Sequence, residues 1–396
     1  MTAHENPFRI GVLAEGVHFA DREEEVARVE RALGEPGARL VVYGDRRLGK
    51  SSVLHEVVGR IRNQERGAAV VVSLATASSE GEAAQRLLGA LQSEIGATWR
   101  DFLEEVARAL EAGLELTADP VTGQPRIRLG LGRRSDPRPE WPLPRVLDAL
   151  QARLEREHRT LGLCLDEFQR LHQWGGEDAE WALREAIQRH TRIAYVFAGS
   201  KRSLIEGMVT TKGRALWKQA DVLPFGPIRP EILGRWIWSR MRETGVEIDR
   251  RAAERIVALT HPRTRDVVQL ARACWPGEGG TVSRDAADVA FEQLVSDQSA
   301  LHARVWRGLG RLDQEVLRVF AIPPDPEDVR ITAAETLDRY ALGPKSTVKN
   351  AVERLVEAEH LVHTEGGYAF DDPYFRRWIQ RNALADLGLP VPPLRP

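Results

Sequence analysis

The sequence of 396 residues contains few lysines, only two cysteines and no long apolar segment. No hydrophobic run approaches the roughly 20 residues that a membrane-spanning helix requires. The first residues, Met1 to Arg9, are polar and lack the pattern of a secretory signal, so we expect a cytoplasmic protein without a membrane segment. The cysteines, Cys164 and Cys274, lie far apart in apolar contexts, which indicates buried, reduced thiols.

The scarcity of lysine gives weight to one position. Six lysines stand against 50 arginines, and Lys50 lies between Gly49 and Ser51, where the composition alone does not explain a lysine. The net charge of -2 excludes a strongly basic protein but leaves local basic patches open. Hydrophobic residues make up 42% of the chain and charged residues 29%, as in ordinary globular proteins, and the length allows two or three domains.

Residues 44–51, Gly-Asp-Arg-Arg-Leu-Gly-Lys-Ser, match the phosphate-binding loop pattern in full. The glycines let backbone N–H groups turn toward the β-phosphate at the positive end of the following helix. Lys50 is expected to reach the β- and γ-phosphates of ATP, and Ser51 to ligate Mg²⁺. The predicted ATP-binding residues of the loop are Gly44, Asp45, Arg46, Arg47, Leu48, Gly49, Lys50, Ser51 and Ser52.

Two acidic residues follow the apolar run Leu161 to Leu165, the third of the predicted strands. In a parallel sheet, the carboxyl end of such a strand lies beside the phosphate-binding loop. We therefore predict that Asp166 orients Mg²⁺ through its water shell and that Glu167 polarises the attacking water. Ser200 ends a further apolar run and is predicted to hold that water near the γ-phosphate.

The hydrophobic periodicity predicts an α/β unit at the start of the chain. A helix is expected over 19–33 with Asp21 as its N-cap. Buried strands are expected at 39–43, 68–74, 161–165 and 193–198, with helices at 51–64, 80–116, 144–158 and 177–190.

Composition divides the chain into three predicted domains. Residues 1–225 form an ATPase core with a parallel sheet, into which a hairpin rich in Pro and Arg is inserted at 117–144. Residues 226–300 form a helical lid, and residues 301–396 form a winged-helix domain whose hairpin turns at Gly366-Gly367. The helices expected in the lid span 231–244, 249–259, 264–274 and 284–298.

Several arginines are candidates to act on the γ-phosphate. Arg202 and Arg214 follow the fourth strand, and such an arginine commonly completes the site of a neighbouring subunit. Arg263 and Arg265 lie where one lid helix ends and the next begins, so one of them is expected to reach back to the nucleotide. With 50 arginines in the chain, a solvated surface charge is the alternative for each.

These motifs resemble those of the archaeal-type ATPases, which belong with the AAA+ and STAND ATPases. The resemblance is carried by the phosphate-binding loop and by Phe19-Ala-Asp-Arg-Glu-x-Glu, Leu-Asp-Glu-Phe-Gln (165–169), Phe-Ala-Gly-Ser (197–200), Gly-Arg (213–214) and Phe-Asp-Asp-Pro-Tyr-Phe-Arg-Arg-Trp (370–378). It spans nearly the whole chain and implies an α/β ATPase core, a helical lid and a C-terminal winged helix.

The resemblance also implies roles for single residues. It implies that Asp21 and Arg22 lie near the adenine and that Pro262 packs on the base. The chain departs from the family at His261, where a glycine is usual, and at Thr-Thr-Lys (210–212), before Gly213-Arg214.

The winged-helix domain leaves two functions open. Its recognition helix, residues 346–358, presents Thr347, Lys349, Asn350 and Arg354 as candidates for a DNA groove. From residue 301 onward, however, the chain carries 13 basic and 14 acidic residues, which favours weak DNA binding, protein contact or autoinhibition. The better electrostatic candidates for DNA are the hairpin segment Arg126–Arg134 and the cluster Lys201, Arg202, Lys212, Arg214 and Lys218.

The sequence therefore predicts an ATP-hydrolysing, Mg²⁺-dependent switch or motor. We expect it to form homo-oligomers and to act on DNA or on a partner effector protein. The alternative is a slow signalling switch whose output is nucleotide exchange and which has no role on DNA.

Overall fold

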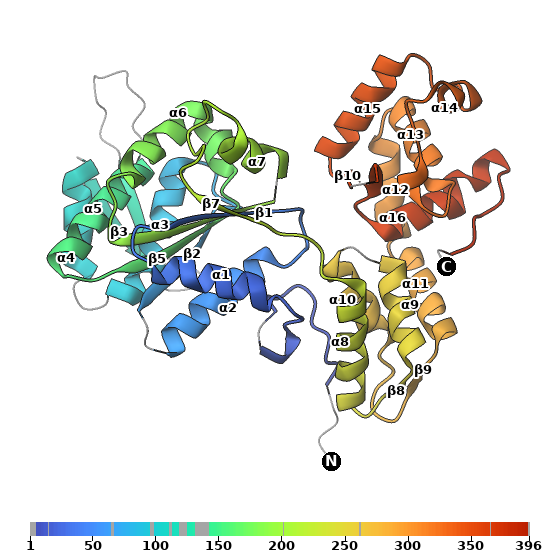
Figure 1. Cartoon of the computed structure of the whole chain (residues 1–396), viewed down its shortest axis with the longest axis horizontal. Coiled ribbons are helices and arrows are strands. Elements are labelled where there is room, and N and C mark those ends of the chain that lie inside the picture. Colours follow the sequence, from blue (N-terminus) through green and yellow to red (C-terminus); the bar gives the residue numbers. More distant parts are fainter. Residues whose placement is uncertain are drawn as a thin grey trace. The chain divides into compact units, whose positions relative to one another are not determined.

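The described residues of the computed structural model form two compact units (Figure 1). Leu13–Gly226 make up the first unit, and Met1–Val12 together with Pro227–Pro396 make up the second. Among the described residues, no helix has the length and apolar character needed to cross a membrane. The structure describes residues 5–394 apart from 15, 65–66, 96–98, 111–112, 119–124, 131–141, 201, 261–262 and 365.

The first unit is built around a parallel sheet of five strands in the order β2-β5-β6-β1-β7. Four strands confirm the apolar runs predicted from the sequence. Sequence patterns do not predict β7, because only one of its four residues is buried and its strand state depends on pairing with β1. The strands are β1 Arg39–Tyr43, β2 Ala68–Ser73, β5 Leu161–Asp166, β6 Ile193–Gly199 and β7 Asp221–Pro224.

Helices cover both faces of this sheet (Figure 1). Val41 and Tyr43 of β1 belong to one core cluster and Leu40 and Val42 to the other, because successive strand residues point to opposite faces. Helices α1 and α2 line the second cluster, and α3 to α7 line the first. The helices are α1 Glu23–Gly34, α2 Lys50–Asn63, α3 Glu80–Ile95, α4 Trp99–Leu110, α5 Pro142–Arg156, α6 Arg170–Ile187 and α7 Arg202–Thr210.

Three helix predictions are wrong at their ends. Helix α1 begins at Glu23, and its cap position is Arg22, which has φ of 84° and makes no side-chain capping bond, so Asp21 is not the N-cap. The helix predicted over 80–116 is two helices, α3 and α4, followed by a strand. Helix α6 begins before the predicted residue 177, and its regular geometry breaks at the glycine pair 175–176.

The inserted segment contains an antiparallel hairpin of β3 (Gly113–Ala118) and β4 (Pro125–Gly130). Thr117 pairs with Arg126 and Glu115 with Arg128. The side chains of Arg126 to Arg134, which were proposed to contact DNA, lie outside the described part of the structure.

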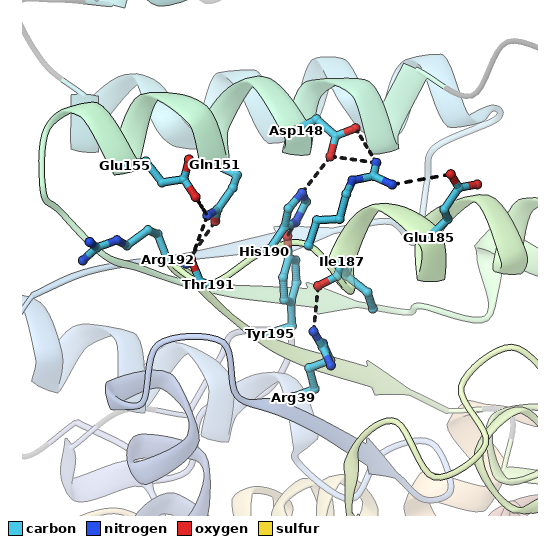
Figure 2. A network of polar contacts seen from close by, with 11 residues as sticks. Arg39, Asp148, Gln151, Glu155, Glu185, Ile187, His190, Thr191, Arg192 and Tyr195 are labelled. Carbon is cyan, nitrogen blue, oxygen red and sulfur yellow. Dashed lines mark hydrogen bonds and ion pairs between the residues drawn. The ribbon is translucent and has the colours of Figure 1, made fainter.

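A buried polar network fixes the amino end of β6 to the helices beside it (Figure 2). His190 is 2% exposed, with Nδ1 2.5 Å from the hydroxyl of Tyr195 and Nε2 2.9 Å from Oδ1 of Asp148. Burial acts to raise the pKa of Asp148, but the hydrogen bond with His190 and the charge of Arg189 outweigh it, and the pKa falls below its ordinary value. Burial raises the pKa of Tyr195. The network thus gives hydrogen-bond partners to buried polar groups at the amino ends of the strands, on the opposite side from the candidate site.

The second unit begins with the chain's first residues. Phe8 is fully buried and meets the ring of Trp236 edge to face, with centroids 5.5 Å apart. Arg272 donates to the carbonyl of Phe8 at 2.8 Å and accepts from Asn6 through its own carbonyl at 3.0 Å. Sequence patterns did not reveal this attachment to the lid.

The lid contains the four predicted helices and one short element in addition. The helices are α8 Pro230–Glu243, α9 Arg250–Thr260, α10 Thr264–Cys274 and α11 Arg284–Asp297. Two residue pairs, β8 Glu247–Ile248 and β9 Thr281–Val282, form a short parallel ladder, so the expectation of helices alone is wrong here.

The C-terminal part has a helical start and an antiparallel hairpin. Leu361 pairs with Phe370 and His363 with Tyr368 across that hairpin. Helix α15 coincides with the predicted recognition helix to within a residue at each end. The elements are α12 Ser299–Gly308, α13 Arg311–Ala321, α14 Ala334–Arg339, α15 Lys345–Glu357, β10 Leu361–His363, β11 Tyr368–Phe370 and α16 Pro373–Trp378.

Candidate functional site

The loop between β1 and α2 depends on its two glycines. A Cβ on Gly44 would lie 2.1 Å from the carbonyl oxygen of Phe225, so no larger residue fits where the backbone leaves β1. Gly49 has φ of 99° at the cap position of α2, a left-handed conformation that glycine adopts readily. Helix α2 then begins at Lys50, so its N-terminal N–H groups face the loop.

Lys50 is buried against its own loop. Its side chain is 6% exposed, and Nζ donates hydrogen bonds to the carbonyl oxygens of Gly44 at 2.8 Å and Asp45 at 2.6 Å. The ammonium group is therefore held inside the curve of residues 44–50, where the backbone N–H groups and the helix dipole favour an anion.

Ser51 and Asp166 come together from different strands. The Ser51 hydroxyl donates to Oδ2 of Asp166 at 2.6 Å, and Asp166 is 5% exposed. Burial raises the pKa of Asp166 above its ordinary value, and the hydrogen bond from Ser51 opposes the rise. A hydroxyl and a carboxylate are the oxygen donors that Mg²⁺ accepts beside water and phosphate, so these residues fit that ion. Within the described residues, no group of three or more His, Cys, Asp and Glu side chains suits another metal.

Glu167 follows Asp166 in an unusual backbone conformation. Its φ is 58°, in the left-handed region that non-glycine residues rarely adopt. The turn is fixed on both sides, since the N–H of Glu167 donates to Oδ1 of Asp166 at 2.9 Å and the N–H of Phe168 donates to the carbonyl of Ala198 at 2.8 Å. Strain of this kind is often retained where a side chain must point in one direction.

The carboxylate of Glu167 contacts the end of the neighbouring strand β6. Ser200 is 7% exposed, and its hydroxyl donates to Oε2 of Glu167 at 2.8 Å. Nε2 of Gln169 donates both to Oε2 of Glu167 and to the hydroxyl oxygen of Ser200, the latter at 3.2 Å. Nε of Arg46, from the phosphate-binding loop, lies 3.4 Å from the same hydroxyl. The sheet order β5-β6-β1 places Ser200 between the strand of Asp166 and the loop.

The remaining loop residues lie in different environments. Leu48 is buried among the residues of α1 and α2, and Arg47 has φ of 64°. The hydroxyl oxygen of Ser52 accepts a hydrogen bond from the N–H of Ala14 at 3.2 Å. Arg46 is exposed.

Arg22 links the start of α1 to the same loop. Its side chain is 5% exposed, and Nη2 donates to the carbonyl oxygens of Gly226 at 2.7 Å and Leu48 at 3.2 Å. Its guanidinium carbon lies 4.1 Å from the ring centroid of Phe225. Burial lowers the pKa of Arg22, and Glu25 opposes this. Asp21, by contrast, is exposed.

Arg214 binds a carboxylate within its own unit. Glu180 of α6 is 1% exposed and accepts from Nη2 of Arg214 at 2.6 Å and from Nε at 3.3 Å. His172 contacts the same carboxylate at 2.7 Å, and Glu177 lies 3.6 Å from Nη1 of Arg214. To act at a neighbouring subunit, Arg214 would have to give up its ion pair with the buried carboxylate of Glu180. Losing such a buried pair is costly in free energy.

The lid arginines differ from each other. Arg263 is 1% exposed, and its Nη2 lies 2.7 Å from Oδ1 of Asp371, beside the winged-helix hairpin. Nearby, the Tyr374 hydroxyl donates to the carbonyl of Asp266 at 3.1 Å. Arg265 is exposed. The assignment of either arginine to the nucleotide stays a prediction.

Some predicted residues lie outside the described structure. These are Pro262, Lys201 and the side chain of Arg202. In the recognition helix α15, the candidate side chains are exposed, but Lys349 lies 3.6 Å from Glu353, and Arg354 lies 2.6 Å from Asp313. Part of the positive charge on this helix is therefore neutralised by neighbouring carboxylates.

Sequence reasoning did not single out Gln169, Glu180 or His172. For Gln169, the only signal is its place at the end of Leu-Asp-Glu-Phe-Gln, directly after the two acids. Glu180 looks like any other helix glutamate in sequence, because its burial depends on Arg214, 34 positions away.

Comparisons with known proteins agree with this architecture. Residues 19–229 match the model of an ATPase domain predominantly from Archaea, and residues 301–381 match that of a probable winged helix domain. The Walker-type ATPase PABY2304 of Pyrococcus abyssi superposes with a TM-score of 0.62 at 17% identity, covering 94% of this chain and 99% of that chain. The ORC2 protein of Aeropyrum pernix, solved as ADPNP–ADP complexes, gives a TM-score of 0.53 at 14% identity, covering 93% and 95%.

At these identities, the likeness to solved structures shows the fold alone. No curated protein matches the chain. The expected parallel α/β core and the C-terminal winged helix are confirmed.

Proposed function

Since the chain belongs to the family of ATPase domains found predominantly in Archaea, we propose that it binds ATP at residues 44–52 and hydrolyses it in a Mg²⁺-dependent reaction. The observation that carries the proposal is the placement of four side chains at the carboxyl ends of β1 and β5, with Ser200 at the end of β6 beside them. The four are Lys50, Ser51, Asp166 and Glu167.

The loop of residues 44–51 and its Lys50 bind the phosphates. Nζ of Lys50 exchanges the carbonyl oxygens of Gly44 and Asp45 for oxygens of the β- and γ-phosphates. Because the lysine already lies within the loop, it needs little reorganisation to do so. The N–H groups at the start of α2 bind the same anion from the other side.

Ser51 and Asp166 are the residues that would hold Mg²⁺, Ser51 as a ligand and Asp166 through the water shell of the ion. When bound, the ion supplies neutralisation of the charge on the phosphates. Glu167 takes the proton of the attacking water, and Ser200 orients that water from the neighbouring strand. We assign Arg46 to the same end of the site, since it reaches Ser200.

The wider function is an oligomerising switch or motor. We propose that nucleotide state is passed to the winged-helix part, which contacts DNA or an effector protein. The basic residues of the hairpin and of the cluster near Lys212 and Lys218 are the proposed DNA contacts. In an oligomer, Arg214 or Arg202 acts on the ATP of a neighbour, Arg22 and Pro262 hold the adenine, and Arg263 or Arg265 senses the nucleotide.

Two substitutions test the site. Lys50→Ala should abolish binding of a fluorescent ATP analogue, whereas Lys345→Ala, an exposed lysine at the start of α15, should leave it unchanged. Retained micromolar binding by Lys50→Ala would refute the phosphate site. Glu167→Gln should bind ATP with unchanged affinity but lose hydrolysis by roughly a hundredfold or more, the usual range for a catalytic base. The control is Glu185→Gln, on the exposed surface of α6.

A second experiment separates motor from slow switch. The mass in solution is measured with and without a non-hydrolysable ATP analogue, and then again with duplex DNA. Assembly with ATP and turnover stimulated by DNA support the motor. A monomer that retains its nucleotide and ignores DNA supports the exchange switch instead.

A further inference from the structure

Gln169 lies at the centre of the catalytic end of the site, yet nothing so far requires it there. Its side chain is 2% exposed at the start of α6. Its amide nitrogen donates to two groups of the proposed reaction, the carboxylate of Glu167 and the hydroxyl of Ser200. One amide therefore joins residues that follow two neighbouring strands, β5 and β6.

The other end of this amide is not satisfied. Oε1 of Gln169 has no hydrogen-bond partner within the described part of the chain. It lies against Gly199, where an added Cβ would come within 2.5 Å of it. An unpaired buried carbonyl destabilises a fold, so a residue kept only for packing would be better replaced by an apolar side chain of the same length. The sequence retains a costly amide where function benefits from its donor.

Glu167 has a reason to need such a donor. Its backbone is held in the left-handed region, which fixes the direction of the Cα–Cβ bond. The backbone alone does not fix the position of the carboxylate at the end of the side chain. A free glutamate side chain has several rotamers, and a displacement of about 1 Å at a reacting group can lower a rate by a hundredfold. The Gln169 amide and the Ser200 hydroxyl both meet Oε2 and so restrict the carboxylate to one position.

We propose that Gln169 is a positioning residue that holds the carboxylate of Glu167 in line with Ser200 for the attack of water. The proposal rests on the proposed hydrolysis at this site, and it goes beyond the motif itself by giving Gln169 a role that acts through Glu167. Gly199 is part of the same arrangement, because any side chain at this position would displace the amide of Gln169.

The decisive variant is Gln169→Met, which keeps the length of the side chain and removes both the donor and the unpaired oxygen. We expect kcat for ATP hydrolysis to fall at least tenfold while KM for ATP and the affinity for a non-hydrolysable analogue stay unchanged. The melting temperature should stay the same or rise. Gln173→Met, at an exposed glutamine of the same helix, is the matched control and should leave kcat unchanged. An unchanged or increased kcat in Gln169→Met would overturn the proposal.

A double-mutant cycle tests whether Gln169 acts through Glu167. In single-turnover measurements, Gln169→Met should have no further effect on the residual rate of Glu167→Gln. Independent, multiplicative losses would overturn the positioning role. Failure of the proposed function is distinguishable, because the unsubstituted chain would then show no hydrolysis at all. Failure of this inference leaves that activity intact and Gln169→Met as active as the unsubstituted chain.

Discussion

We expect Glu80→Gln to stabilise the first unit at neutral and alkaline pH but not in acid. Glu80 begins α3 and is 5% exposed, and its Oε1 accepts a hydrogen bond from the N–H of Leu143, at the start of α5, at 3.1 Å. Its Oε2 has no partner among the residues that the structure describes. Burial raises the pKa of Glu80 from 4.5 to about 7, and the hydrogen bond from Leu143 opposes the rise only in part.

The sign of the effect follows from proton binding. The unfolded chain loses this proton near pH 4.5, whereas the folded chain holds it to about pH 7. Between these values the folded state binds more protons, so stability falls as the pH rises and levels off above the folded pKa. At about 1.4 kcal/mol for each pH unit, the full loss is about 3 kcal/mol. Glutamine keeps the acceptor for Leu143 but does not ionise, so the variant avoids this loss.

The assay is urea unfolding of the whole chain, followed by far-ultraviolet circular dichroism at a series of pH values from acid to alkaline. The advantage of Glu80→Gln over the unsubstituted chain should grow with pH and reach about 3 kcal/mol above pH 7. Glu82→Gln is the control, because the N–H of Ser78 and the side chain of Arg86 lower the pKa of Glu82 to about 2. Above about pH 6 Glu82 is ionised in both the folded and the unfolded chain, so its substitution should give a constant offset there. In acid that offset should shrink, because the unfolded chain takes up this proton first. Stability curves of Glu80→Gln and the unsubstituted chain that run parallel would refute the reasoning.

Three further changes test other contacts. Asp371→Asn removes the carboxylate charge that lies 2.7 Å from the buried Arg263 and should lower the free energy of unfolding, by up to roughly 3–5 kcal/mol, measured in urea; a change below about 1 kcal/mol would show that this ion pair adds little to stability. Arg214→Ala should lose ATPase activity and regain part of it when mixed with Lys50→Ala, if the arginine acts across an interface; intact assembly without rescue argues against that role. Tyr195→Phe removes the hydroxyl that meets the buried histidine and should cost about 1 kcal/mol in thermal unfolding, whereas unchanged stability would show that this bond contributes nothing.

The candidate nucleotide site could be proposed from the sequence because its signals are local. Residues 44–51 carry their own glycines, lysine and serine in one short run, and the acids 166–167 end an apolar run long enough to predict a buried strand. Four of the five strands were predicted for the same reason, since their residues are apolar on both faces.

The positions that sequence reasoning missed depend on partners far along the chain. Strand β7 has too few buried residues to be recognised alone and exists by pairing with β1, about 180 positions earlier. Glu180 is indistinguishable from a surface glutamate until Arg214 reaches it. The first residues of the chain are polar in sequence and show no attachment to another segment, but Phe8 is buried against Trp236 of the lid.

The sequence by itself predicted the glycine-rich loop of residues 44–51, the acidic end of a buried strand and the α/β alternation typical of a parallel sheet, because each of these signals lies in residues that are neighbours in the chain. Only the tertiary structure decided which side chains meet around that loop. Gln169 joins Glu167 to Ser200 because the sheet places β6 between β5 and β1, and Arg263 is paired with Asp371 because the lid packs on the winged-helix part. Burial and pairing between distant segments are properties of the folded chain, and local sequence patterns do not predict them.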